Sequence, residues 1–283
     1  MNVLPIQPDP KSDSNLKGSK DMINNILVPE DILCMQYAEI PASRILTGKF
    51  NDFEFAEAYE AYIDKAEEIM AIQEERGVVT LTFQDEDFPE TLRKIKADCP
   101  PMIHCLGDIT LLDAEYSRIA IIGARAASSE GNKKAYELGK KLTENGNIIV
   151  SGLALGCDKS AHEGCLDAGV KTIAIVASSL NIVHPKENAP LQRRILDNGG
   201  LILSEHPLGV KANPSRLVAR NRLQAALSKS VILAECPRQS GSMHTMRFAR
   251  KYHKQCFAAS FLKYTDVNTG NKFLLENNLA QPI

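Results

Sequence analysis

The chain has 283 residues, of which 44% are hydrophobic and 24% are charged. This is the composition of a globular protein with room for one large domain and a smaller one. The formal net charge of −2 hides an asymmetry, since residues 1–117 hold 10 Lys and Arg against 23 Asp and Glu, whereas residues 118–283 hold 23 against 12. The basic second part predicts an anionic ligand; the alternative is two solvated surfaces of opposite sign that merely pack together.

The seven cysteines are odd in number, scattered and without a C-x-x-C pair, which is typical of reduced thiols in the cytoplasm. Cys99, His104 and Cys105 are close in sequence, but without a second ligand pair they make a poor zinc site, so neither a metal nor a cofactor is expected. The N-terminus has no apolar signal segment, and no apolar run approaches the roughly 20 residues that span a bilayer. We expect a soluble, cytoplasmic protein without membrane contact.

The first part of the chain predicts a polar tail and a small helical module. Residues 1–28 are expected to be a disordered tail, because their beginning is rich in Pro, Ser, Asn and Asp. Residues 29–77 are expected to form a helical N-terminal module with an acidic outer face. Apolar residues recur there at helical spacing and form one stripe, which consists of Phe53, Ala56, Tyr59 and Ile63. Acidic residues lie mostly off that stripe, namely Glu54, Glu57, Glu60 and Glu67.

Residues 78–260 predict an α/β domain, followed by a C-terminal tail at 261–283. Apolar strands are expected at 78–83, 102–106, 119–123, 148–152, 172–177, 201–204, 231–235 and 256–259. Helices are expected at 89–95, 129–145, 158–168, 190–197, 220–229 and 243–252. Buried strands that alternate with amphipathic helices indicate a doubly wound, mostly parallel sheet. Such sheets bind ligands beyond the carboxyl ends of the strands, at the topological switch point.

Two strand-to-helix loops carry glycine. The first contains Gly123 and Arg125 but lacks the full dinucleotide fingerprint, so the arginine favours phosphate pairing over a dinucleotide cofactor. The alternative is that Gly123 only makes the turn and Arg125 pairs with a neighbouring acid. The second loop contains Ser151 and Gly152, and it leads to Asp158, which we expect to be an N-cap.

His162, one turn into the helix that follows the second loop, is expected to be a packing residue. Asp158 and His162 are spaced by four residues, with Cys157 beside them. A thiol, a histidine and an aspartate within one helical turn do not form a nucleophile that is activated by an oriented base, so a hydrolase is not supported.

A third loop and an arginine cluster complete the candidate site. Ser240, Gly241 and Ser242 form a small-residue loop suited to closing around a phosphate. Between Glu205 and Cys256 there are 10 Lys and Arg but only 2 acids. Charged guanidinium groups are almost never fully buried unpaired, so the cluster is expected at the surface of a helix start. Its candidate phosphate-binding residues are Lys211, Arg216, Arg220, Asn221 and Arg222.

These motifs, in this order from about residue 80 to 259, resemble the DNA-processing protein A family, also called DprA or Smf. The matching segments are Ile122 to Arg125, Ser151 to Ala154 with Gly156 and Asp158 to His162, His184 to Asn188, Leu203 to Pro207, Arg220 to Arg222, and Ser240 to Ser242. The resemblance implies an extended Rossmann domain that binds single-stranded DNA in a basic pocket and forms a homodimer. It also implies a role in protecting DNA during natural transformation and in loading a RecA-type recombinase.

By position, Arg125, Arg220 and Arg222 match the family's pocket arginines, and the Ser240 loop matches its phosphate-facing edge. Since Arg220 and Arg222 are expected to begin a helix at a strand's carboxyl end, we expect them to be the chief phosphate anchors, with Arg125 third. On a helix they project about 200° apart, so one of the two can face inward.

The chain also departs from the family pattern. Ala124 stands where the family has serine, which removes an expected phosphate hydrogen bond. Leu217 and Val218 replace a Phe-Pro pair, and this removes a stacking platform worth roughly 1–3 kcal/mol per base. A winged-helix tail is not expected, and the acidic module differs from the family's usual N-terminal domain. A diverged role in defence or mobile-element biology therefore stays open.

Two other function classes use similar folds. Nucleotide phosphoribohydrolases carry a glycine-rich loop followed by a glutamate, whereas no acid follows the Ser240 loop until Asp266, so no enzyme is expected. A nucleotide sensor is the third class. Release of free base from nucleoside monophosphates would identify the enzyme, and titration with oligonucleotide against mononucleotide would separate the two binders.

Overall fold

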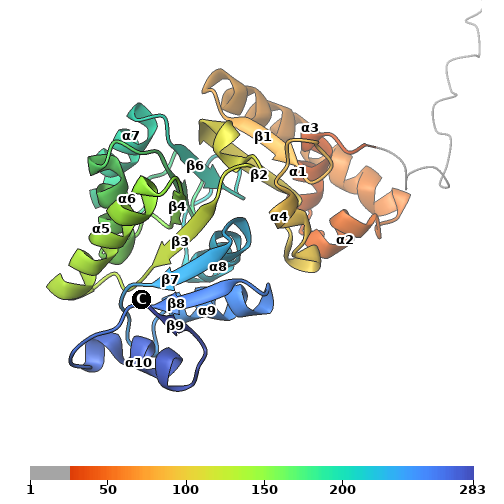
Figure 1. The fold of residues 1–283 in the computed structure, drawn as a ribbon. Coiled ribbons are helices and arrows are strands. Elements are labelled where there is room, and N and C mark those ends of the chain that lie inside the picture. Colours follow the sequence, from red (N-terminus) through yellow and green to blue (C-terminus); the bar gives the residue numbers. More distant parts are fainter. Residues whose placement is uncertain (1–25) are drawn as a thin grey trace, which may run out of the picture.

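A nine-stranded sheet organises residues 26–283, the part of the chain that the computed structural model describes (Figure 1). The predicted tail at residues 1–28 lies outside the described residues except for its last three. The strands are β1 (Val79–Thr82), β2 (Met102–Gly107), β3 (Arg118–Ile122), β4 (Ile148–Ser151), β5 (Thr172–Ile175), β6 (Leu201–Ser204), β7 (Ser230–Leu233), β8 (Gln255–Ala258) and β9 (Gln281–Pro282).

The strand order is β1-β2-β6-β5-β4-β3-β7-β8-β9. The neighbours from β6 to β9 are parallel, and only the β1–β2 and β2–β6 pairs are antiparallel. The predicted doubly wound, mostly parallel sheet is therefore confirmed. The chain order reverses between β3 and β7, which places the switch-point crevice beyond the ends of these two strands.

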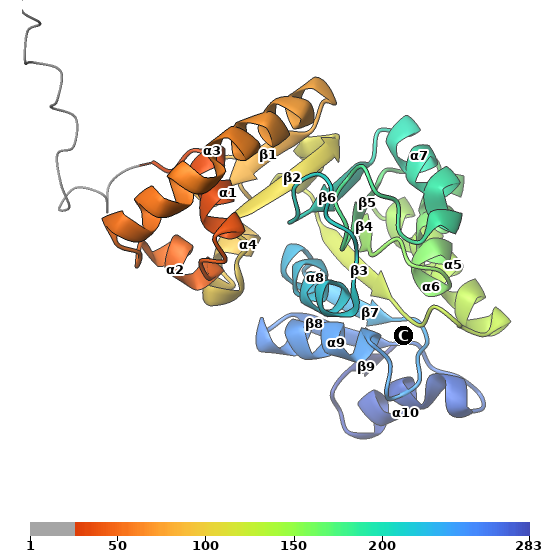
Figure 2. The ribbon, with the colours of Figure 1, turned by 180° about the vertical axis from the view of Figure 1, so that it is seen from behind.

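Helices cover both faces of the sheet. One face packs against α5 (Ser129–Glu144), α6 (Cys157–Asp167) and α7 (Ala189–Asp197). The other face packs against α4 (Glu90–Arg93), α8 (Pro214–Leu227), α9 (Ser242–Lys251) and α10 (Thr269–Glu276). Helices α8 and α9 lie side by side, as the rear view shows (Figure 2). This two-sided cover explains why the central strands read as continuous apolar runs.

The helical module that the sequence predicts at residues 29–77 consists of α1 (Pro29–Tyr37), α2 (Ala42–Thr47) and α3 (Asp52–Glu75). The three helices surround their own small core, which also takes in Met102 from β2. The module lies at the β1–β2 edge of the sheet, far from β9 (Figure 1). None of the described helices is both long enough and apolar enough to cross a membrane.

Two predicted boundaries are wrong. Helix α8 begins at Pro214 instead of Arg220, because the Asn213 side chain caps it by accepting a hydrogen bond from the Arg216 amide at 2.8 Å. Residues 261–283 are not a loose tail, since they contain α10 and β9, and β9 extends the sheet beside β8.

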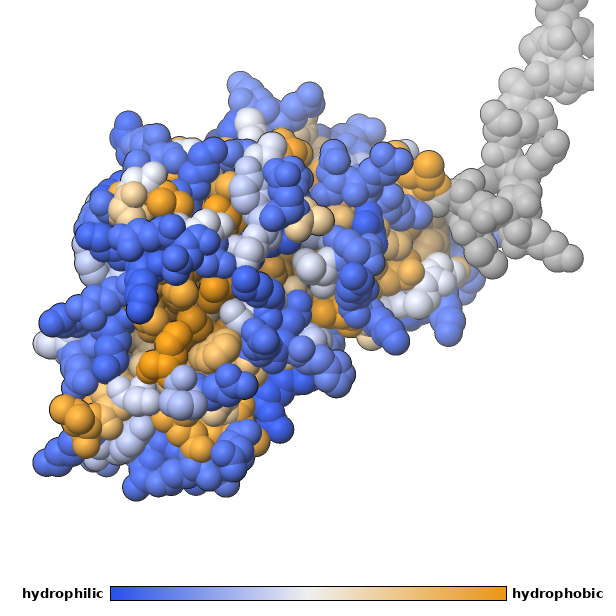
Figure 3. Space-filling view, viewed as in Figure 1, coloured by the Kyte–Doolittle hydropathy of each residue, from blue (hydrophilic) through white to orange (hydrophobic). Residues whose placement is uncertain are grey.

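Hydrophilic residues dominate the surface of the front view, although hydrophobic residues gather in one hollow of that face (Figure 3).

Asn271 fixes the C-terminal segment to the sheet. Its side chain is fully buried, and its Nδ2 donates to carbonyl oxygens at the ends of β7 and β8, those of Leu233, Ala234 and Ala259 at 3.1–3.3 Å. Its Oδ1 accepts from the Cys236 amide at 3.0 Å. A single side-chain amide thus satisfies three backbone groups that would otherwise be buried without partners, the carbonyl groups of Ala234 and Ala259 and the amide of Cys236. The Leu233 carbonyl oxygen also accepts from the Ala259 amide at 2.9 Å.

We predict that Asn271→Leu lowers the free energy of unfolding by about 2–4 kcal/mol, because leucine leaves these buried backbone groups unsatisfied. The measurement is urea unfolding followed by circular dichroism. The matched control is Asn277→Leu at the exposed end of the same helix, which should change stability by less than about 0.5 kcal/mol. Equal stability of the two variants would show that Asn271 does not anchor the segment.

Candidate nucleic-acid interface

A crevice of about 290 Å³ opens at the switch point, beyond the carboxyl ends of β3 and β7. Segments far apart in the sequence line it, from the β3–α5 loop, α6, α8 and the start of α9. The lining residues are Ile122, Gly123, Arg125, Ala154, Asp158, Leu217, Val218, Arg220, Asn221, Gln224, Ser240, Gly241, Ser242 and Thr245. The structure therefore brings the first and third predicted loops together with the helix that carries the arginine cluster.

The β3 loop and the α9 loop are joined directly. The Ser242 hydroxyl donates to the Gly123 carbonyl oxygen at 2.7 Å, and the Ser242 amide donates to the Ser240 hydroxyl at 3.3 Å. Gly123 cannot be replaced without movement, because an added Cβ would lie 2.3 Å from the Cys157 sulfur. These contacts place the amino end of α9, with its positive dipole end, at the crevice.

Arg220 forms the floor of the crevice. Its side chain is only 4% exposed, and its guanidinium donates to the carbonyl oxygens of Gly152, at 2.8 Å, and Ile175. Its Nε has no hydrogen-bond partner among the described residues. The expectation of a surface arginine at a helix start is therefore wrong: Arg220 is buried in the middle of α8. Burial lowers its pKa to about 10, and Asp158 opposes this shift, so the group remains charged at neutral pH.

Gly152 lies against this arginine, not against open solvent. A Cβ on Gly152 would lie 2.3 Å from Arg220 Nη1, so glycine is required for the guanidinium to fit. Ser151 is fully buried and donates to the Ile121 carbonyl oxygen at 2.6 Å. Neither residue lines the crevice, although both were predicted to contact a ligand. Instead, Gly152 holds the Arg220 guanidinium and Ser151 holds the neighbouring strand β3.

Asp158 is the residue of the crevice that sequence reasoning missed. It is not the predicted N-cap, since Gly156 occupies that position of α6. Its Oδ2 accepts from the amides of Gly152 at 3.1 Å and Ala154 at 3.4 Å. Burial raises the pKa of the carboxyl group, and the positive charge of Arg220 opposes that effect. The sequence signal for this role was the spacing of six residues between Gly152 and Asp158. That spacing lets the carboxylate at the start of α6 accept from the amide at the end of β4.

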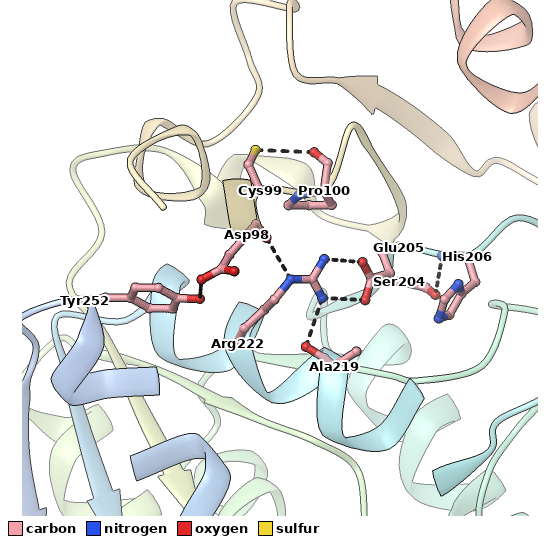
Figure 4. A network of polar contacts seen from close by, with 9 residues as sticks. All are labelled: Asp98, Cys99, Pro100, Ser204, Glu205, His206, Ala219, Arg222 and Tyr252. Atoms are coloured by element: carbon pink, nitrogen blue, oxygen red, sulfur yellow. Dashed lines mark hydrogen bonds and ion pairs between the residues drawn. The ribbon is translucent and has the colours of Figure 1, made fainter. Parts of the chain in front are cut away.

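Arg222 points away from the crevice, because residues two apart on a helix project about 200° from each other. Figure 4 shows its guanidinium bound to both carboxylate oxygens of Glu205, at 2.7 and 2.5 Å, and its Nε bound to the Asp98 carbonyl oxygen at 2.7 Å. The Arg222 and Glu205 side chains are only 14% and 13% exposed. Arg222 does not line the crevice, so the expectation that its charge is free to anchor phosphate is wrong.

Arg125 and Asn221 lie where the sequence predicts a ligand. The Arg125 side chain is exposed at the crevice, and no ion pair or hydrogen bond within the described residues occupies its guanidinium. The alternative that Arg125 pairs with a neighbouring acid is therefore not what the structure shows. Asn221 donates to the Gly241 carbonyl oxygen at 3.3 Å, which ties α8 to the serine loop.

Lys211 and Arg216 do not line the crevice. Lys211 is exposed, and its carbonyl oxygen accepts a hydrogen bond of 3.0 Å from the partly exposed Arg216. Ala124, at the family's serine position, is also buried outside the lining. The crevice wall contains Leu217 and Val218 and, among the described residues, no aromatic ring.

The neighbouring buried groups are structural. His162 is fully buried with its Nδ1 2.9 Å from the Thr172 hydroxyl, and burial lowers its pKa to about 3, which confirms a packing role. Glu235 is fully buried and accepts from the Ser128 amide at 2.6 Å and hydroxyl at 2.9 Å, which fixes the start of α5. Residues 26–283 contain no group of three or more His, Cys, Asp or Glu side chains placed to hold a metal ion.

Comparisons with known proteins agree on one family. A family model described as DNA recombination-mediator protein A matches residues 79–283. Protein Smf of Synechocystis is 34% identical over 180 residues, which are 63% of this chain and 45% of that protein. The DNA processing protein DprA of Streptococcus pneumoniae is 36% identical over 179 residues, 63% of this chain and 62% of that protein. The match thus spans about half to three fifths of these relatives.

Two solved structures are also similar. The X-ray structure of DNA processing protein A from Streptococcus pneumoniae has a TM-score of 0.73 and 30% identity, covering 91% of this chain and 90% of that one. A structure of DNA processing protein A from Helicobacter pylori, described for its single-stranded DNA binding mode, has a TM-score of 0.65 and 36% identity, covering 73% and 90%. With the family model matching well over half of its length, the chain belongs to the DNA recombination-mediator protein A family, the family of DprA and Smf.

Proposed function

We propose that the chain is a cytoplasmic DNA-processing protein that binds single-stranded DNA in the switch-point crevice. In this role it protects DNA and assists a RecA-type recombinase during transformation or recombination. The observation that carries the proposal is the buried cation Arg220 at the floor of the crevice, with the exposed Arg125 and the Ser240 loop above it. The Helicobacter pylori relative, described for its single-stranded DNA binding, supports the same ligand class.

The charge balance of the crevice favours a polyanion. Among residues 26–283, Asp158 is the one carboxylate in the lining, and two backbone amides already share its Oδ2. Arg220 and Arg125 supply two positive charges, and the positive end of α9 lies beside them. In a partly buried site of low dielectric, such an excess attracts a phosphate more strongly than in water.

Single-stranded DNA fits this site better than a base-reading ligand. Of the residues that the structure describes, only Asn221 and Gln224 supply amide side chains to the lining, and Asn221 is already bound to Gly241. Contacts to phosphates position a strand without reading its sequence, so we expect little sequence preference. The crevice is concave and has a volume of about 290 Å³, a size that suits a short segment of one strand.

The proposal is binding without turnover. The Ser240 loop has no carboxylate of its own, and the Asp158 carboxylate accepts from the backbone of its own loop. The described part of the chain therefore places no general acid–base pair at the crevice. A nucleotide sensor remains the alternative, and a mononucleotide that binds as tightly as an oligonucleotide would favour it.

A homodimer and a recombinase partner are part of the proposal, and the hydrophobic hollow in Figure 3 is consistent with an interaction surface.

Arg125→Ala should weaken binding of single-stranded DNA about tenfold and reduce the slope of log affinity against log salt by about 0.7, the value of one phosphate contact. The measurement is fluorescence anisotropy across a salt series. The matched control is Arg193→Ala on α7, an exposed arginine outside the crevice, which should leave both quantities unchanged. A wild-type slope in the Arg125 variant would place the phosphate site elsewhere.

Leu217→Phe should restore a stacking platform at the crevice wall and raise affinity by about 1 kcal/mol, roughly fivefold. The same titration measures it, with Leu262→Phe, at a fully exposed position outside the crevice, as the control. If both variants bind like the wild type, bases do not pass over the α8 wall.

Arg222 should matter for stability and not for DNA binding. Arg222→Met leaves the Glu205 carboxylate buried without its partner and should cost about 3–5 kcal/mol, whereas Arg222→Met combined with Glu205→Leu should recover most of that loss. Thermal unfolding measures the first effect. The folded double variant should keep the wild-type DNA affinity and salt slope. A smaller slope of log affinity against log salt would show that Arg222 contacts the DNA.

The pH dependence of stability checks the same ion pair. Burial opposes ionisation of Glu205, but the hydrogen bonds and charge of Arg222 outweigh it and hold its pKa below the ordinary value. The contribution of a carboxylate with a lowered pKa is complete above its unfolded value, about 4.3, and is lost as the pH falls through the folded value. The wild type should therefore lose stability in acid more steeply than the double variant.

A further inference from the structure

We propose a second phosphate-binding site, the basal groove, which holds a later segment of the same DNA strand; this rests on the proposed function of the crevice. The groove consists of two adjoining hollows of about 380 and 540 Å³ that share His253 and Lys254. No Asp or Glu is among the described residues that line either hollow. Its basic lining residues are Lys94, Lys96, Arg250, Lys251, His253 and Lys254.

The basal groove lies at the opposite end of α9 from the crevice. Ser242 begins α9 in the crevice lining, whereas Lys251 ends it in the groove, next to the first residues of β8. A helix of 10 residues is about 15 Å long, so the two sites are separate. The groove is therefore at the amino ends of the parallel strands, where the topology of the sheet predicts no ligand.

Asp98 neutralises Lys251, but no ion pair within the described residues reaches the other lysines of the groove or Arg250. The Lys254 ammonium donates to the Ala226 carbonyl oxygen at 2.9 Å; burial lowers its pKa, and the charges of Arg118 and Lys94 lower it further. Asp98 is the nearby acid, but Lys251 and the Tyr252 hydroxyl, at 2.7 Å, already share one oxygen of its carboxylate. Several like charges thus stay crowded together, a cost that a bound polyanion removes.

A row of basic and polar side chains on α9 connects the two sites. His244, Arg247 and Lys251 are spaced by three and four residues, so they lie on one side of the helix. The Arg247 guanidinium lies 3.3 Å from His244 Nδ1, and Arg247 and Lys251 are exposed. A phosphodiester backbone that leaves the crevice beside Ser242 can follow this row to the groove.

The groove also offers a surface for bases that the crevice lacks. Tyr252 is partly exposed and lines one hollow together with the apolar Ile95. Aromatic rings next to a basic track are the usual arrangement for single strands bound without sequence preference. The competing occupant is the acidic face of α3 from a second copy of the chain, which the experiment must separate from DNA.

The test uses the full chain with Lys94→Gln and Lys96→Gln together, both exposed and outside the crevice. The matched control is Lys133→Gln with Lys141→Gln on α5, which removes the same charge from the other face of the sheet. Anisotropy titrations across a salt series use oligonucleotides of about 3 and about 30 nucleotides, one shorter and one longer than a track along α9 requires, since one strand carries a phosphate about every 3.4 Å.

For the long oligonucleotide, the groove variant should lose about fivefold in affinity and about 1.4 in salt slope, the value of two phosphate contacts. The short oligonucleotide should bind all three proteins alike. Wild-type affinity and slope of the groove variant on the long strand would overturn the basal groove and leave the crevice intact. If the wild type binds neither strand, the proposed function itself fails.

Sedimentation velocity without DNA distinguishes the competing occupant. If the wild type self-associates, and the groove variant does not while still binding the long strand normally, the groove is a contact between copies of the chain and the proposal is wrong. An unchanged sedimentation coefficient in the variant, together with weaker binding of the long strand, supports the DNA site.

Discussion

The buried guanidinium of Arg220 is the interaction on which the rest of the site depends. It binds the carbonyl oxygens of Gly152 and Ile175, so one side chain of α8 holds the carboxyl ends of β4 and β5. Gly152 must be glycine for this contact, and Asp158 orders the loop between them. A buried cation with an incompletely satisfied guanidinium is costly on its own. An anionic ligand above it offsets that cost, which links the packing of the scaffold to the chemistry of the crevice.

Helix α8 uses its two neighbouring arginines for different purposes. Arg220 faces the crevice, whereas Arg222 faces the polar network of Glu205, Asp98 and Tyr252 in Figure 4. The ion pair of Arg222 fixes the helix to Glu205, directly after β6, and its hydrogen bond to the Asp98 carbonyl oxygen fixes the helix against the segment that leads from α4 into β2. Because a helix turns by about 100° per residue, a spacing of two is enough to separate a ligand-binding role from a structural one.

The pattern of apolar strands and amphipathic helices was enough to predict the parallel sheet, since strands covered on both faces read as continuous apolar runs. The start of α8 was missed because its cap, Asn213, and Pro214 lie in a polar stretch without apolar periodicity. The burial of Arg220 depends on carbonyl oxygens 68 and 45 residues away, which no local pattern reveals. The same holds for Asn271, whose partners at the end of β7, Ala234 and Leu233, lie 37 and 38 residues earlier and fix the C-terminal segment to the sheet.

The most direct test of the account is a crystal structure of the chain with a single-stranded oligonucleotide of about 6 nucleotides. The account predicts a phosphate in the switch-point crevice, within hydrogen-bond distance of Arg125 and the Ser240 loop, with the Arg220 guanidinium beneath it and Arg222 still bound to Glu205. A strand bound on another surface while the crevice stays empty, or a phosphate held by an Arg222 that has left Glu205, would contradict it.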